Sequence, residues 1–392
     1  MPSHPANESA PYIEELRIPF RYPVHFTRGV FDPANPILAE VMRRADDTVP
    51  RTLVYLDSGL VAAHGYLPDA IHAYAARQAD AMRLEAEPRV LPGGEAVKDG
   101  WQFALKVVDE IVEHRLCRHS FVVAAGGGAF LDVVGLAASL VHRGVRLIRL
   151  HSTTLAQGDR GVGVKNGIDA DGTKNLIGTF APPFAVINDL AFLATLPHDV
   201  LLDGVTEAFK VAIIKDVAFF RFLAESASRL AAGEMPVVEQ TVRRTAILHL
   251  DHIRDAGDPF EMGAARPLDF GHWAAHRLEG LSNYALRHGQ AVAIGIALDS
   301  HYAWRKGLLT RAGLEDILGA FRRATLPTWH PLLGERGAEG KLLVLEGLEQ
   351  FREHLGGRLC ITLPNGLGRR IEVHEMDLAV VEEGIRFLGG RG

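Results

Sequence analysis

Three histidines, a glutamate and a lysine in the second half of the chain have types and spacings that suit metal binding and catalysis. His272 and His276 are four residues apart, which places both imidazoles on one face of a helix. His288 precedes another helix-like segment, and Glu207 and Lys210 are three residues apart in an otherwise apolar sequence. Each feature also has an ordinary explanation, because the chain has 18 histidines and Glu–Lys pairs at this spacing are common helical salt bridges.

A run of three glycines, 126–128, follows the apolar segment 121–125 and precedes a helical pattern. Glycine lets the backbone approach a ligand closely, and a helix N-terminus offers free N–H groups to a pyrophosphate. Asp57 ends an earlier strand-like segment, where it could accept hydrogen bonds from a ribose, and the loop 92–98 could add polar contacts. A tight turn and a helix cap explain these features equally well, because the G-x-G-x-x-G fingerprint is absent.

Lysine, asparagine and glycine are concentrated in two short segments, 163–167 and 172–175. This composition predicts a loop, and it suits an anionic ligand such as a phosphate. A solvated loop without a ligand has the same composition, so these segments alone leave both interpretations open.

The elements that must position these residues follow from the hydrophobic pattern. Strand-like segments 52–56, 121–125 and 145–150 alternate with helical patterns, which predicts a mainly parallel sheet covered on both faces. We therefore predict an α/β Rossmann-like N-terminal domain, residues 1–198, and a mostly α-helical C-terminal domain, residues 199–392, with cofactor and substrate in the cleft between them. Helical periodicity in the second domain covers 200–215, 237–254, 272–281, 289–306 and 314–324, and a strand pair is expected near 358–363 and 370–373.

Composition restricts the class of protein. A chain of 392 residues suits two domains, and 47% hydrophobic and 23% charged residues are ordinary for a soluble globular protein. The net charge is −6, and the charged residues are spread along the chain without a block of like charge. The absence of clustered lysine and arginine argues against a nucleic-acid partner. The longest apolar stretch, 121–141, contains three glycines and Asp132 and is not a membrane span. Two cysteines and a polar N-terminus without a signal-peptide core lead us to expect a cytoplasmic protein.

Taken in order, the motifs resemble the 3-dehydroquinate synthase family of sugar phosphate cyclases over about residues 50–390. The string from Arg266 to Trp273 looks most like the divergent members encoded in bacterial ebo clusters. The matching series comprises the glycine turn, Ser152-Thr153-Thr154-Leu155-Ala156-Gln157, the lysine loop, Thr195-Leu196-Pro197, Glu207-x-x-Lys210, Asp269-Phe270-Gly271-His272-x-x-x-His276 and His288-Gly289.

The resemblance implies three sets of site residues. It implies that Glu207, His272 and His288 bind a divalent metal, usually zinc, although another such as cobalt is compatible. The implied NAD site consists of Asp57, Glu95, Lys98, Gly127, Gly128, Asp132, Thr153, Thr154, Lys165, Lys174, Phe192, Thr195 and Leu196. The implied catalytic and substrate-facing residues are Asp159, Lys165, Lys174, Asn175, Lys210, Glu261, Arg266, Asp269 and His276, with Arg143 reaching the phosphate site of a neighbouring subunit in a homodimer.

The resemblance also implies the chemistry. In this family NAD⁺ oxidises a ring alcohol, phosphate is eliminated, the ketone is reduced again, and ring opening with an intramolecular aldol step closes a carbocycle. We expect a lyase acting on a seven-carbon sugar phosphate, either 3-deoxy-arabino-heptulosonate 7-phosphate, which gives 3-dehydroquinate, or a related substrate. Two alternatives are an NAD- and metal-dependent alcohol dehydrogenase of the glycerol dehydrogenase type and a non-catalytic binding protein that kept the fold.

Several substrate-side positions depart from the family pattern. Asp269 replaces an asparagine that contacts phosphate, and Asp251 replaces a lysine, with His249 and His252 beside it. Arg266 is displaced by one residue from the family's carboxylate-binding arginine. A lysine pair near residue 352 is also missing, and Arg352 is the nearest substitute. Because the metal and NAD positions persist, we predict the same type of reaction on an altered substrate.

Overall fold

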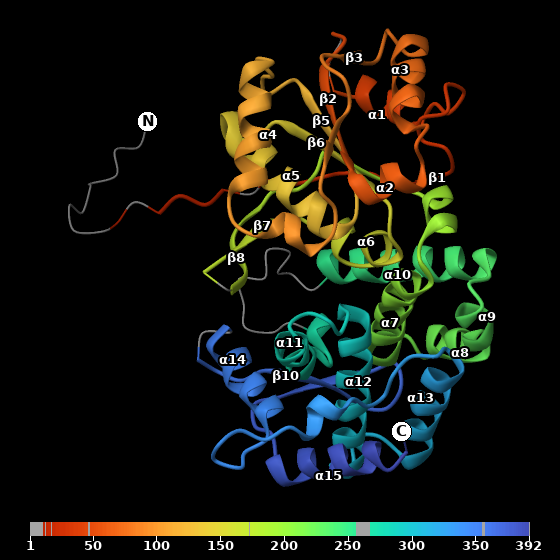
Figure 1. The fold of residues 1–392 in the computed structure, drawn as a ribbon, viewed down its shortest axis with the longest axis vertical. Coiled ribbons are helices and arrows are strands. Elements are labelled where there is room, and N and C mark those ends of the chain that lie inside the picture. The colour runs from red at the N-terminus through yellow and green to blue at the C-terminus, as the bar shows by residue number, and fades with distance from the viewer. Residues whose placement is uncertain are drawn as a thin grey trace, which may run out of the picture.

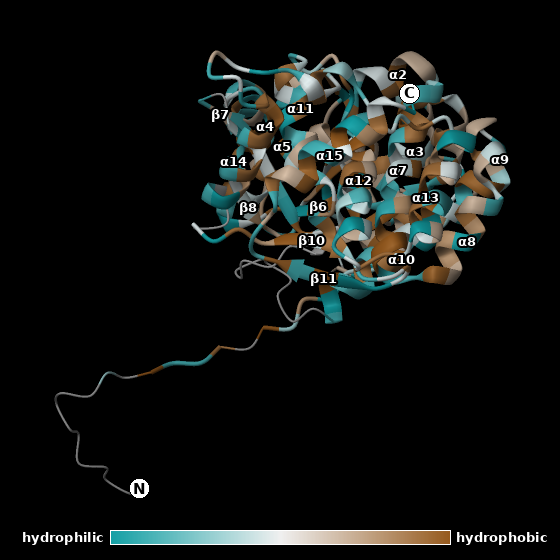
Figure 2. Ribbon diagram, turned by 90° about the horizontal axis from the view of Figure 1, so that it is seen from below, coloured by the Kyte–Doolittle hydropathy of each residue, from teal (hydrophilic) through white to brown (hydrophobic). Residues whose placement is uncertain are grey.

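The computed structural model describes residues 11, 13–16, 18–45, 48–171, 173–255, 267–354 and 357–391. The described residues before the first strand extend away from the folded body (Figure 2). Their apolar side chains Ile13, Leu16, Ile18 and Phe20 are exposed. Among the helices of this described part, none combines the length and the apolar character that crossing a bilayer requires.

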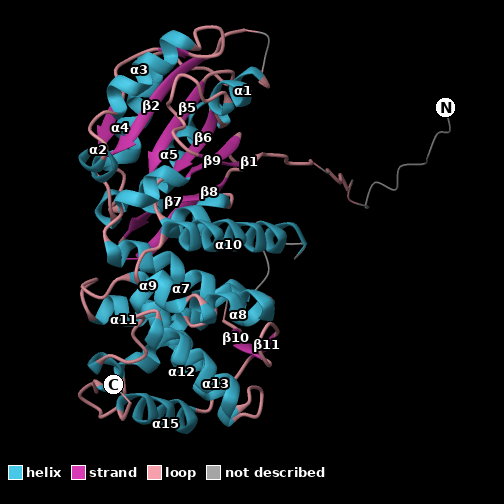
Figure 3. Cartoon of the chain, turned by 90° about the vertical axis from the view of Figure 1, so that its right-hand side faces the viewer, coloured by secondary structure: helices cyan, strands magenta, loops and turns pink. Residues whose placement is uncertain are grey.

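A parallel sheet forms the N-terminal part of the molecule (Figures 1 and 3). Within the described residues it has seven strands in the order β1-β9-β6-β5-β2-β3, and β4 also pairs with β2. Its central strands are almost entirely buried, as expected of a parallel sheet covered on both faces. The strands are β1 (Val24–Thr27), β2 (Arg51–Asp57), β3 (Arg83–Leu84), β4 (Arg89–Leu91), β5 (Phe121–Gly126), β6 (Arg146–His151) and β9 (Ala185–Asp189).

Helices cover both faces of this sheet. Successive side chains of β2 alternate between the faces, so Leu53 and Tyr55 pack with α4 and α5, whereas Val54 and Leu56 pack with α1 and α3. An antiparallel hairpin of β7 and β8 lies beside α5. The bounds are α1 (Ile37–Arg43), α2 (Ser58–Ala63), α3 (Leu67–Arg77), α4 (Gln102–Glu113), α5 (Gly128–Leu140), α6 (Thr154–Gly158), β7 (Lys165–Ala170) and β8 (Thr173–Phe180).

The C-terminal part is mostly helical and has its own apolar core. Its central helix is α12, in which every residue from Ala291 to Ala303 is buried between α7, α11, α13 and α15. The bounds are α7 (His198–Lys215), α8 (Val217–Glu225), α9 (Ala227–Ala231), α10 (Met235–Asp255), α11 (His272–Leu281), α12 (His288–Arg305), α13 (Arg311–Arg323), α14 (Glu346–His354) and α15 (Leu378–Gly389), with an antiparallel pair β10 (Ile361–Pro364) and β11 (Arg370–Val373). Short 3-10 turns are η1 (Glu95–Lys98), η2 (Val141–Arg143), η3 (Arg160–Val162), η4 (Leu190–Thr195), η5 (Pro267–Asp269), η6 (Pro331–Gly334) and η7 (Leu343–Leu345).

The predicted fold class, a parallel α/β part followed by a mostly helical part, is confirmed. The expected strands and helices occur within a few residues of the predicted bounds. Residue 198 is the first residue of α7, so the proposed domain boundary falls at the beginning of that helix. The division into two domains at this residue stays a prediction.

Candidate active site

Helix α7 contributes a buried carboxylate and a buried ammonium to the candidate site. Glu207 and Lys210 are 1% and 2% exposed and form an ion pair through Glu207 Oε2. Lys210 Nζ also lies 3.6 Å from Asp159 Oδ2, at the end of α6. Close packing of α6 on α7 allows this contact, since a Cβ on Gly204 would lie 2.5 Å from Thr154 Cβ. The pair is thus a helical salt bridge, but one that is buried and shared with a second carboxylate.

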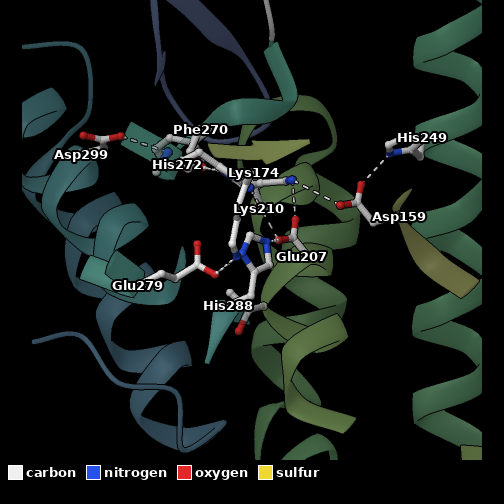
Figure 4. Close-up of polar contacts among 12 residues, drawn as sticks. Asp159, Lys174, Glu207, Lys210, His249, Phe270, His272, Glu279, His288 and Asp299 are labelled. Carbon is white, nitrogen blue, oxygen red and sulfur yellow. Dashed lines mark hydrogen bonds and ion pairs between the residues drawn. The ribbon is translucent and has the colours of Figure 1, made fainter. Parts of the chain in front are cut away.

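The beginnings of α11 and α12 bring two histidines to Glu207 (Figure 4). His272 Nε2 lies 3.9 Å and His288 Nε2 lies 3.4 Å from Glu207 Oε1. Among the residues that the structure describes, these three form a group whose potential ligand atoms all lie within 4.8 Å of one another. Because Lys210 pairs with Oε2, Glu207 Oε1 is left to face the two imidazoles.

Hydrogen bonds orient both imidazoles with Nε2 toward Glu207. His272 Nδ1 donates to the carbonyl oxygen of Phe270, 3.1 Å away. His288 Nδ1 lies 3.4 Å from Glu279 Oε1. A histidine that ligates a metal through one ring nitrogen commonly donates the other N–H to a carbonyl or carboxylate, and this contact fixes the tautomer. Glu279 was not among the predicted residues, although its position one helical turn after His276 was a signal that could have identified it.

The chemistry of these donors fits a divalent cation such as zinc. Burial, with further contributions from Lys210 and the neighbouring histidines, holds the pKa of His272 well below its usual value, so its imidazole is neutral and able to ligate. Burial alone would lower the pKa of His288, but hydrogen bonds to Glu207 and Glu279 raise it to about 9. One carboxylate and two imidazoles form a three-ligand set that leaves coordination positions for substrate oxygens.

A second carboxylate, Asp159, connects this group to α10. Its Oδ1 lies 2.6 Å from His249 Nδ1, whereas its Oδ2 faces Lys210. Burial would raise the pKa of Asp159, but Lys210 and His249 hold it well below the usual value. Asp251 on the same helix is turned outward and pairs with Arg254 at 2.9 Å. His249 rather than Asp251 therefore lines the site (Figure 4).

Lys174 connects the β7–β8 hairpin of the α/β part to the helical part. Its Nζ lies 3.2 Å from Glu279 Oε1 and 3.9 Å from Glu95 Oε2, over the ring of Tyr284. Glu279 also contacts His288. Lys174 is therefore linked to the candidate metal ligand His288 through Glu279.

Two further predicted residues, His276 and Asp269, lie near the same group. The exposed His276 has its ring centroid 5.4 Å from that of His272. Asp269 is close enough to raise the pKa of Lys210. Lys165 is exposed at the beginning of β7.

At the carboxyl ends of β2 and β5, Asp57 accepts hydrogen bonds from two backbone N–H groups. These come from Gly59 at 2.7 Å and Gly127 at 3.3 Å, so the carboxylate both caps α2 and contacts the glycine turn. Glycine is required opposite it, since a Cβ on Gly93 would lie 2.0 Å from Asp57 Oδ1. Apart from its chain neighbours and its own helix backbone, no atom of the described residues lies within 4 Å of the Cβ position at Gly128, the first residue of α5. This side of the turn has room for a ligand.

Lys98, Asp132 and Asn175 form one network beside α5. The fully buried Lys98 donates to Asp132 Oδ2 at 2.9 Å and to Asn175 Oδ1. Asn175 has a positive φ of 54°, and its backbone N–H donates to Asp169 Oδ1. Asn175 was predicted to face the substrate, whereas in the structure it contacts the network of Lys98 and Asp132, two residues predicted for the NAD site.

Other residues predicted for NAD make contacts within the protein. Thr153 caps α6 by accepting from Ala156 N, and the Thr154 hydroxyl donates to the carbonyl oxygens of residues 200 and 201 at the beginning of α7. Thr195 Oγ1 lies 2.7 Å from His64 Nε2. Phe192 is buried against the His64 ring, Leu196 packs against the core of the helical part, and Glu95 is exposed.

Arg143, Glu261 and Arg266 are the remaining predicted catalytic residues. Glu261 and Arg266 lie outside the described residues. Arg143 is exposed beyond the C-terminal end of α5, a helix of 13 residues, and thus lies about 20 Å from the glycine turn at the other end. His142 and Arg143 have consecutive positive φ angles of 52° and 62°.

Comparisons with known proteins agree with this geometry. The chain matches the family model for the N-terminal part of 3-dehydroquinate synthase over residues 89–203 and the model for its C-terminal part over residues 204–342. It is 31% identical to a 2-epi-5-epi-valiolone synthase from Actinomyces sp., over 94% of this chain and 96% of that protein. It is 35% identical to the 3-dehydroquinate synthase of Ruegeria sp. (strain TM1040), over 73% of this chain and 76% of that protein.

A solved structure is also similar. It is the 2-epi-5-epi-valiolone synthase from Streptomyces hygroscopicus subsp. jinggangensis 5008 with NAD⁺ and Zn²⁺ bound, with a TM-score of 0.85 and 28% identity over 97% of this chain and 100% of that one. The fold and the matches define an enzyme of the sugar phosphate cyclase class. The chain belongs to the 3-dehydroquinate synthase family, which confirms the resemblance found in the sequence.

Proposed function

We propose that this enzyme is an NAD- and metal-dependent cyclase that eliminates phosphate from a seven-carbon sugar phosphate and closes a carbocycle by an intramolecular aldol step. The observation that carries the proposal is the group of Glu207, His272 and His288 next to the buried Lys210, in a member of this family. The NAD⁺ and Zn²⁺ bound to the Streptomyces hygroscopicus relative support both cofactors.

The residues fit distinct tasks. Glu207, His272 and His288 would hold the metal, and the surface at Asp57, Gly127 and Gly128 would receive NAD. When bound, the metal would supply Lewis acidity at a substrate oxygen, and the nicotinamide would take up and return one hydride, so that no net NADH forms.

The cationic side chains of the site would act on the phosphate and on developing negative charge. Lys165, Lys174 and His276 would bind the phosphate as it leaves. Lys210, whose pKa is raised by Asp159 and Glu207 against the effect of burial, stays protonated and would stabilise an oxyanion. Asp159, fixed between His249 and Lys210, can accept a hydrogen bond from a substrate hydroxyl.

We favour a substrate without a carboxylate, namely sedoheptulose 7-phosphate, over 3-deoxy-arabino-heptulosonate 7-phosphate. Asp159, Glu207 and Asp269 already surround Lys210, so these acidic groups would repel a permanently charged substrate carboxylate. The residue in the position of the family lysine, Asp251, is acidic and turned outward. Two similar relatives are named for the synthesis of 2-epi-5-epi-valiolone, a product without a carboxylate, which supports the same choice.

The test is to incubate the zinc- and NAD-loaded enzyme with each of the two sugar phosphates and to follow inorganic phosphate and NADH absorbance. We expect phosphate release from sedoheptulose 7-phosphate without net NADH. Release only from the heptulosonate would support the ordinary 3-dehydroquinate reaction instead. Stoichiometric NADH without phosphate would identify a dehydrogenase, and an absence of zinc and NAD binding would indicate a non-catalytic protein.

A further inference from the structure

A buried carboxylate on α12, outside the site described above, contacts both neighbours of His272. Asp299 is fully buried and lies 11 residues after His288 on α12. Its Oδ2 accepts a hydrogen bond from the backbone N–H of Gly271 at 3.0 Å, and its Oδ1 accepts one from Trp273 Nε1 at 2.8 Å. The two bonds therefore hold the chain on each side of the histidine.

The turn that carries His272 lies directly against α12. Gly271 has a φ of +80°, and a Cβ there would lie 2.8 Å from the backbone nitrogen of Ile296. A Cβ on Gly295 would lie 2.0 Å from the carbonyl oxygen of Gly271. Because the two backbones meet without side chains between them, a shift of α12 moves the turn, and with it the Phe270 carbonyl that orients the His272 ring.

Burying the carboxylate of Asp299 costs free energy that a purely structural contact does not require. Burial raises its pKa to about 7 even though both hydrogen bonds act in the opposite direction. Apolar side chains of similar size often stabilise a core as well as a buried charged group does. A carboxylate gives what an apolar residue lacks, which is two directional bonds to a particular backbone N–H and a particular indole.

We propose that Asp299 is a positioning residue for the metal site, which holds the His272 ring in line with Glu207 and His288. Helix α12 then determines two of the three ligand positions, since it carries His288 directly and fixes His272 through Asp299 (Figure 4). The proposal rests on the metal site of the proposed function.

The test measures zinc affinity by competition with a chelator, together with thermal unfolding of the metal-free protein. In Asp299→Asn one oxygen becomes an NH₂ group, which faces an N–H donor and loses one of the two bonds. We expect this variant to bind zinc about 10–100-fold more weakly, the usual cost of losing a contact that orients a ligand. Trp273→Phe removes the indole N–H together with part of a buried ring, and it should lose affinity in the same direction, while the unfolding measurement reports the cost of the lost packing.

Ser300→Ala is the matched control. Ser300 is equally buried on the same helix, and its hydroxyl has no hydrogen-bond partner among the described residues, so zinc affinity should not change. A folded Asp299→Asn protein with the affinity of the wild type would overturn the proposal. If Asp299→Asn does not fold, the zinc affinity of Trp273→Phe is the test instead. A wild-type zinc affinity of Trp273→Phe would then overturn the proposal.

The result is separable from the proposed reaction. Wild-type protein that binds zinc but releases no phosphate from either sugar phosphate contradicts the proposed function. The role of Asp299 is then still tested by the zinc affinities of the variants. Wild-type protein that binds no zinc overturns both.

Discussion

At the scale of single residues, the candidate site combines groups whose protonation is set by their neighbours. His272 is kept neutral mainly by burial, whereas His288 next to it is kept protonated by two glutamates in the absence of a cation. A metal that binds here would take the place of the His288 proton and would balance the buried charge of Glu207.

Replacing His272 by alanine tests the ligand assignment. We expect His272→Ala to lose bound zinc and activity together, because two remaining ligands do not hold zinc in a protein site. Metal content per chain, measured by atomic absorption after dialysis, gives the answer. His249→Ala is the comparison, since His249 contacts Asp159 rather than Glu207 and should retain zinc. Full zinc content in His272→Ala would contradict the assignment.

At the scale of elements, the contact between α12 and the turn before α11 depends on glycine. We expect Gly295→Ala to lower the free energy of unfolding by about 1–3 kcal/mol, because its Cβ would lie 2.0 Å from the carbonyl oxygen of Gly271. Gly280→Ala on α11 is the control, since no atom lies within 4 Å of its Cβ position, and it should stabilise by about 0.5–1 kcal/mol. Urea unfolding of both variants should give changes of opposite sign, and an equal or raised stability for Gly295→Ala would exclude this packing.

The packing of α12 on α15 predicts a loss of stability in acid. His301 is buried among Trp304, Phe387 and Gly384, and neither ring nitrogen has a hydrogen-bond partner among the described residues. Burial, with smaller effects of Arg305 and Arg391, lowers its pKa to about 4. Below about pH 6.5 the unfolded chain gains a proton that folded His301 does not accept, so stability is fully present above pH 6.5 and falls by up to about 3 kcal/mol toward pH 4.

Chemical unfolding at several pH values between 7 and 4 measures this effect. We expect the free energy of unfolding of His301→Leu to fall less between pH 7 and pH 4 than that of the wild type. His72→Leu, which removes a histidine paired with Glu87 at the surface, is the control for the loss of a histidine outside the core. If the free energy of unfolding of His301→Leu falls as steeply in acid as that of the wild type, groups other than His301 cause the loss of stability.

At the scale of the whole molecule, the site depends on both parts of the chain. The α/β part supplies Asp159 and Lys174, and the helical part supplies Glu207, His272 and His288. The Lys174–Glu279 contact joins the two parts directly at the site. Arg143 is exposed after the C-terminal end of α5, at the opposite end of that helix from the glycine turn, so the role predicted for it involves a second subunit.

Complementation between two variants tests the proposed homodimer. We expect Arg143→Ala and His272→Ala to be nearly inactive alone, because each substitution would inactivate both active sites of a dimer. After co-refolding in equal amounts, activity should return to about a quarter of the wild-type value, since half of the dimers would be mixed and would contain one intact site. Light scattering should show twice the mass of one chain. No recovery from mixed dimers would exclude a role for Arg143 across the interface.

The sequence by itself determined the elements and the order of the chemical motifs. The apolar runs of β2, β5 and β6 and the periodic segments of α7, α11 and α12 are local patterns, so they specify strands and helices without knowledge of the fold. The order of the motifs along the chain likewise indicated the family before any contact was known.

Only the tertiary structure decided which side chains meet. Asp251 and His249 are two residues apart on α10, hence about 200° apart around the helix axis, and the rotation of that helix turns His249 to Asp159 and Asp251 to the surface. The pairing of Lys98 with Asn175, the contact of Glu279 with His288 and the two bonds from Asp299 arise in the same way. They join residues far apart in sequence, whose relative position depends on how whole elements pack, and no local pattern contains that information.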